Sequence, residues 1–61
     1  MDARSSINLA LASHLHDALV CIKRAQEEAH HFVGPERTAL VRELLSAEMS
    51  LSRALMLVGE S

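Results

Sequence analysis

The chain is short, aliphatic and weakly acidic: it has 61 residues, of which 49% are hydrophobic, and a formal net charge of −2. This length allows one domain with a marginal core, and a single cysteine excludes an internal disulfide. The small negative charge argues against a nucleic-acid partner.

The first predicted helix covers residues 5–33. Ala and Leu dominate the chain and there is one aromatic residue, a composition that favours helices over strands. Apolar residues recur at alternating steps of three and four, the spacing of a helical packing seam. The predicted seam consists of Asn8, Leu11, Leu15, Ala18, Ile22, Ala25, Ala29 and Phe32, and is widened by Ile7 and Leu19. This face should pack against a second helix.

One cluster of side chains in this helix has the chemistry of a metal site. His14, Asp17 and Cys21 lie three and four residues apart, on one edge of the helix. They could ligate a soft divalent metal ion if another chain supplied a fourth ligand, which would make the protein a metal-responsive sensor. Such a trio is more often a solvated helix flank in which the cysteine behaves as a small apolar residue. We therefore expect no metal site, no cofactor and no catalytic residue.

The sequence FVGPER predicts a tight turn at residues 33–35. Gly34 tolerates the left-handed backbone conformation that ends many helices, and Pro35 suits the first turn of the next helix. Glu36 stands where the positive end of a helix dipole favours a carboxylate. We expect a loop of one to three residues, after which the chain runs back along the first helix.

The second predicted helix covers residues 36–58 and has a main apolar stripe. The stripe consists of Leu40, Leu44, Ala47, Leu51, Ala54, Leu55 and Val58. In an antiparallel hairpin this stripe places Leu44 near Ala25. Glu48 lies close to the stripe, so we expect it at the margin of the packed surface or paired with a cation, Lys23 or Arg24.

Further apolar side chains lie outside this stripe. In the second helix they lie roughly 100 to 150° from the centre of the stripe, and a lone hairpin would leave them in water. Two more lie on the outer side of the first helix. The partner-binding residues predicted in this way are Leu45, Met49, Ser52 and Met56, with Val20 and Leu9 as a second patch.

This excess of apolar surface predicts self-association. Two hairpins packed as a four-helix bundle would give each helix two neighbours. Methionine is also frequent on surfaces that accept varied helices, so the same residues could dock a client protein. We expect a single helical-hairpin domain, residues 1–61, that forms a homodimer and acts as a non-enzymatic regulator or adaptor. Whether the exposed residues serve the dimer or the client stays open at this point.

Two helices of about 25 residues around a tight turn resemble, in layout, the plasmid copy-control RNA-binding proteins of the Rop type. The resemblance covers nearly the whole chain and implies nucleic-acid binding. Such binding needs a cationic stripe, usually with aromatic side chains for stacking. The six basic residues are dispersed and Phe32 belongs to the predicted core, so nucleic-acid binding is the alternative to protein contact.

The sequence does not indicate a membrane protein or an exported protein. Its longest apolar run, residues 54–58, is far shorter than the roughly 20 residues that span a bilayer. The first residues, MDARSSINLALASH, have an acidic side chain and only a short apolar patch, unlike a secretory signal. We therefore expect a cytoplasmic protein without membrane contact.

Overall fold

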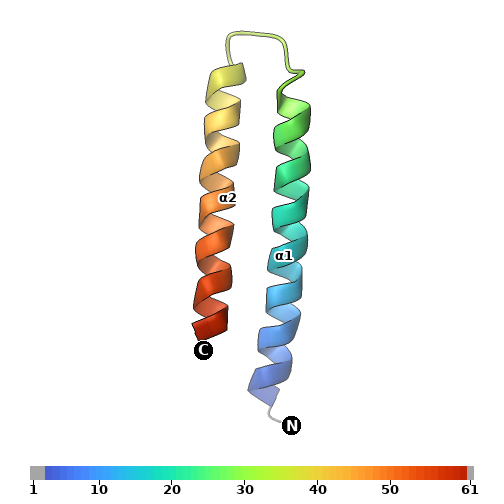
Figure 1. Ribbon diagram of the computed structural model, residues 1–61, viewed down its shortest axis with the longest axis vertical. Helices are drawn as coiled ribbons and strands as arrows, with labels where there is room; N and C mark the ends of the chain where they lie inside the picture. The colour runs from blue at the N-terminus through green and yellow to red at the C-terminus, as the bar shows by residue number, and fades with distance from the viewer. Residues whose placement is uncertain (1–2, 61) are drawn as a thin grey trace.

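The protein is an antiparallel hairpin of two long helices. The computed structural model describes residues 3–60, with the side chains of residues 6–60. Helix α1 spans Ala3–Ala29 and helix α2 spans Arg37–Glu60. The helices lie side by side, with both chain ends at one end of the molecule and the loop at the other (Figure 1). The predicted all-α fold of two antiparallel helices is confirmed; residues 1, 2 and 61 of the predicted domain lie outside the described residues.

The hairpin is a thin rod. Its principal extents are 51 × 15 × 10 Å and its radius of gyration is 14.7 Å. A compact domain of this length would have a radius of gyration of about 10.5 Å. A rod of two helices has no interior, because each helix has only one neighbour. The two helices can therefore shelter only the side chains along their line of contact.

The first helix ends earlier than residue 33, where we predicted its end. It stops at Ala29, and the next residues form tighter turns. The His30 N–H donates to the Glu27 carbonyl at 3.3 Å, and the Phe32 N–H donates to the Ala29 carbonyl at 3.1 Å. Bonds between residues three apart are typical of a helix end that tightens toward a 3₁₀ helix. His, Phe and Val have lower helix propensities than the Glu and Ala before them, so the loop covers residues 30–36 instead of one to three residues.

Gly34 shapes this loop, but it does not cap α1 as predicted. It lies within the loop with φ of 150°, a conformation that side-chain-bearing residues rarely adopt. The Arg37 N–H donates to the Gly34 carbonyl at 3.2 Å, and the Leu40 N–H donates to the Glu36 carbonyl at 2.9 Å. Pro35 therefore takes the second position of a turn that leads directly into α2, which suits its fixed φ. The chain reverses at the predicted place, and α2 starts and ends within two residues of the prediction.

The helices meet along a seam of buried or half-buried residues, spaced alternately three and four apart. In α1 the seam is Asn8, Ala12, Leu15, Leu19, Ile22, Gln26 and Ala29, and in α2 it is Val41, Leu44, Glu48, Leu51, Leu55 and Val58. The prediction that Ile7, Leu11, Phe32 and Leu40 belong to the packed surface is wrong, since all four are exposed. A strict heptad step from Asn8 leads instead through Ala12 and Gln26.

The two helices are aligned in the register that the sequence predicts. The Gln26 Nε2 donates to the Leu44 carbonyl at 3.4 Å, and Ala25 and Leu44 line the same hollow, so their predicted proximity is confirmed. Because Gln26 bonds to Leu44, a residue of α1 and a residue of α2 lie at the same height along the rod when their numbers add to about 70. Glu60, at the end of α2, therefore lies at the height of residue 10 of α1. Residues 3–9 of α1 therefore extend past the end of α2, as the blue end of Figure 1 shows. We call this segment the overhang.

Candidate protein-contact surface

Half of the apolar side chains among residues 6–60 are exposed to solvent. Among residues 6–60 the single buried hydrophobic side chain is that of Ala29, which is 4% exposed. The accessible surface is 4904 Å², whereas a compact chain of 6.7 kDa would expose about 3,900 Å². Burial of apolar surface is the main favourable term in folding, so a single hairpin lacks much of the stabilisation of an ordinary domain. A partner surface would supply the missing burial.

Each of the six predicted contact residues stands directly after a seam residue. Leu9 and Val20 follow Asn8 and Leu19 in α1, and Leu45, Met49, Ser52 and Met56 follow Leu44, Glu48, Leu51 and Leu55 in α2. One residue corresponds to a rotation of about 100° in a right-handed helix. Because α1 and α2 are antiparallel and face each other along the seam, this rotation leads to the same side of the hairpin in both helices. The six residues therefore lie on one side of the hairpin, which we call the strip face.

The strip face exposes large and flexible apolar side chains. Leu45, Met49 and Met56 are 50%, 56% and 65% exposed, and the other three members of the face are exposed as well. Along α2 the strip-face residues follow one another at steps of four, three and four: Leu45, Met49, Ser52 and Met56. They therefore form a continuous ridge on one side of the helix. A ridge at this spacing can pack into the groove between the side chains of another helix. The strip face therefore has the form of a helix-docking surface.

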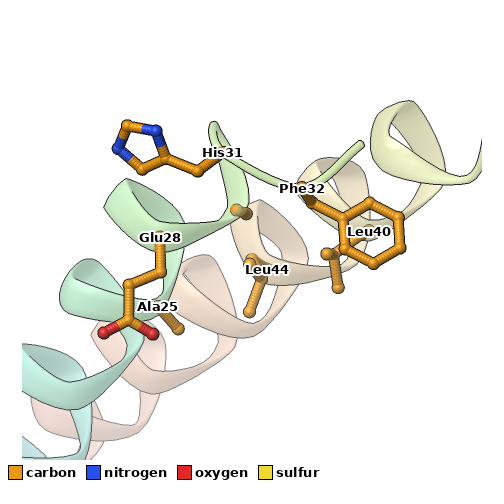
Figure 2. A pocket seen from close by; sticks show the side chains of 7 residues that line it. Ala25, Glu28, His31, Phe32, Leu40 and Leu44 are labelled. Atoms are coloured by element: carbon orange, nitrogen blue, oxygen red, sulfur yellow. The ribbon is translucent and has the colours of Figure 1, made fainter. Parts of the chain in front are cut away.

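The opposite face has a hollow at the loop end of the hairpin. The hollow has a volume of about 370 Å³ and is lined by Ala25, Glu28, Ala29, His31, Phe32, Leu40 and Leu44. Figure 2 shows the Phe32 ring and the Leu40 side chain together near the loop, with Glu28 and His31 standing apart from them on the α1 side. Ala25, Glu28 and Leu40 stand directly before seam residues, so the hollow opens away from the strip face. We call this side the hollow face.

Gln26 is the residue that the sequence analysis missed. Its side-chain Nε2 donates to Glu48 Oε1 at 2.7 Å, and both side chains are half-buried in the seam. The expectation that Glu48 would meet Lys23 or Arg24 is wrong. Both cations lie outside the seam and are exposed, whereas Gln26 occupies the seam position itself. Its spacing of four from Ile22 and three from Ala29 was the signal that could have identified it.

The three metal-ligand candidates in α1 lie on the surface of the helix. His14, Asp17 and Cys21 are all exposed. Within the described part of the chain, no three His, Cys, Asp or Glu side chains come together so that they could hold a metal ion. Side chains on one edge of a single helix diverge from its axis, and here no further ligand from α2 closes the group. We base no proposal on this trio.

Comparison with known proteins adds no function to this geometry. No protein family, curated protein or solved structure matches the chain. Between residues 3 and 60, neither helix combines the length and the apolarity that crossing a membrane requires.

Proposed function

We propose that this protein is a non-enzymatic regulator or adaptor that acts by protein–protein contact, with a second copy of itself and with a client protein. The observation that carries the proposal is the imbalance between apolar composition and burial. The chain is 49% hydrophobic, yet Ala29 is the single buried hydrophobic side chain among residues 6–60. Exposed apolar patches of this extent on small proteins mark interaction surfaces.

The strip face is the surface that we assign to the client. It presents an unbranched, polarisable pair, Met49 and Met56, between which Ser52 adds a small polar group. Flexible methionine side chains adapt to different partner surfaces, a property of regulators that accept helical segments. The matching client surface is the apolar side of an amphipathic helix, with anchors three to four residues apart.

The experiment compares proteins retained from the native host by three forms of the full chain. The first is the unchanged protein, and the second carries Met49→Glu and Met56→Glu, which place two charges on the strip face. The third carries Ala39→Glu and Ser46→Glu, which add the same charge to exposed positions of α2 that neither precede nor follow a seam residue directly.

We expect a client that the unchanged protein and the Ala39/Ser46 variant retain and that the Met49/Met56 variant loses. Mass spectrometry identifies the client, and titration of the purified pair measures its affinity. Equal retention by all three forms, or retention of no protein by any of them, would contradict the role of the strip face.

A further inference from the structure

We propose that a second copy of this chain packs on the hollow face, antiparallel to the first, so that the overhang of each chain fills the hollow of the other. The inference rests on the self-association in the proposed function and deepens it by naming the surface and the arrangement. It leaves the strip face free for a client, because the two faces lie on opposite sides of the hairpin.

The overhang and the helical turn that follows it carry two apolar side chains on the hollow face. Ile7 and Leu11 stand directly before the seam residues Asn8 and Ala12, so they point to the hollow face. They are 65% and 44% exposed. Ile7 has no counterpart in α2, because α2 ends level with residue 10. Leu9 lies between them in sequence but turns to the strip face.

The overhang of one chain and the hollow of the other can lie at the same height along the rod. A two-fold axis midway between the levels of residues 18 and 19 of α1 brings the level of Ile7 opposite the level of residue 30, and that of Leu11 opposite residue 26. The partner's Ile7 then reaches Phe32 and Leu40 at the loop end of the hollow. The partner's Leu11 reaches Ala25 and Leu44. Two-fold symmetry repeats both contacts, so one arrangement fills both hollows.

The middle of the hollow face is rich in small side chains, which favours a close approach of two hairpins. Four half-buried alanines stand directly before seam residues there: Ala18, Ala25, Ala47 and Ala54. Helices with small residues at their contact pack at the short end of the range of about 8–10 Å between axes. The exposed residues His14, Cys21 and Ser50 also stand directly before seam residues in this stretch. The large apolar side chains of Ile7 and Leu40 lie at opposite ends of the face, where the overhang and the hollow are.

The exposed surface area of two chains is sufficient for a stable dimer. Two separate chains expose about 9,800 Å², twice the 4904 Å² of one chain. A compact body of twice the mass, 6.7 kDa per chain, would expose about 6,500 Å². The difference, about 3,300 Å², lies within the range of about 2,000–5,000 Å² that permanent dimers bury. A dimer that overlaps along its full length therefore removes the excess exposure of both chains.

The first test compares two substitutions in the same overhang. Ile7→Ala and Leu9→Ala remove similar side chains, both exposed in the single hairpin, two residues apart on the same helix. We expect Ile7→Ala to weaken dimerisation about a hundredfold in sedimentation equilibrium, about tenfold for each of the two symmetric sites, and Leu9→Ala to leave it unchanged. Equal effects of the two substitutions would overturn the proposed arrangement.

The second test is a disulfide between two chains. With Cys21→Ser as background, Ile7→Cys and Leu40→Cys stand about 35 Å apart within one chain, so they can bond only across the dimer. We expect a covalent dimer on mild oxidation, and none from the matched pair Leu9→Cys and Leu40→Cys. A dimer that fails to cross-link through residues 7 and 40 overturns this inference but leaves the self-association in the proposed function standing. A chain that sediments as a monomer at high micromolar concentration overturns both.

Discussion

Gln26 and Glu48 meet across the seam, with 2.7 Å between the amide Nε2 and the carboxylate Oε1. The same amide group also donates to the Leu44 carbonyl at 3.4 Å, so one side chain ties α1 to both the backbone and a side chain of α2. Half-buried polar pairs in an apolar seam add little net stability but penalise any other alignment, since a shifted register leaves them unpaired. We interpret this pair as the feature that sets the register of the hairpin.

Removing one member of this pair should destabilise the hairpin. Gln26→Leu leaves the Glu48 carboxylate half-buried without its donor, and we expect a loss of about 1–2 kcal/mol in the free energy of unfolding. The double substitution Gln26→Leu with Glu48→Leu should recover that loss, because two apolar side chains can replace a buried polar pair. Urea denaturation at one fixed protein concentration measures both effects. A Gln26→Leu variant as stable as the unchanged protein would show that the pair does not stabilise the hairpin.

The two glycines should respond to alanine in opposite directions. At Gly34 the backbone has φ of 150°, and an added Cβ would lie 3.3 Å from Glu36 Oε2 and 3.6 Å from Phe32 Cε1. We expect Gly34→Ala to cost about 1–3 kcal/mol. Gly59 lies in α2 with no atom within 4 Å of an added Cβ, so Gly59→Ala should add up to about 1 kcal/mol. Thermal unfolding followed by circular dichroism compares them, and a stabilising Gly34→Ala would refute our view of the loop.

Charged substitutions on the strip face and on the hollow face should have different effects on the dimer. Leu40→Glu places a carboxylate in the hollow, where the proposed dimer buries it against apolar side chains, so we expect monomers. Met49→Glu with Met56→Glu changes only the strip face and should leave the dimer mass intact. Light scattering at matched concentrations measures both masses. If the Met49/Met56 variant is the one that dissociates, the second copy occupies the strip face instead.

Thermal stability should depend on protein concentration. Unfolding of a dimer releases two chains, so mass action lowers the melting temperature on dilution. With so little surface buried in a single hairpin, we expect a shift of a few degrees for each tenfold dilution. Calorimetry or circular dichroism across two decades of concentration measures the shift. A melting temperature that is constant over this range indicates a hairpin that is stable by itself.

The sequence predicted the helices well and their ends less well. Alternating steps of three and four identified both helices, and Gly34 with Pro35 located the reversal of the chain. The end of α1 was placed four residues too late, because Phe32 continues the apolar spacing beyond Ala29 although residues 30–33 have a low propensity for helix. Phe32 was assigned to the core for the same reason, and the tightened turns carry it out of the helical line.

Part of the candidate contact surface was also predictable. All six residues predicted to bind a partner are exposed, because a helix that packs one stripe of residues against its neighbour leaves the residues beside that stripe in water. Their grouping into one face was not predictable from each helix alone. The grouping depends on which side of each helix packs against the other helix. That is known only when the seam residues of both helices are known.

By itself, the amino-acid order determined that this chain forms two amphipathic helices joined by a reversal, because propensity and periodicity act within a few residues of each other. The tertiary structure alone decided that Gln26 holds Glu48, that α1 outreaches α2, and that a hollow opens beside Phe32 and Leu40. These features depend on the register and the mutual rotation of the two helices. Both depend on contacts between the two helices, such as those of Gln26 with Leu44 and Glu48, 18 and 22 positions away, which local spacing does not encode.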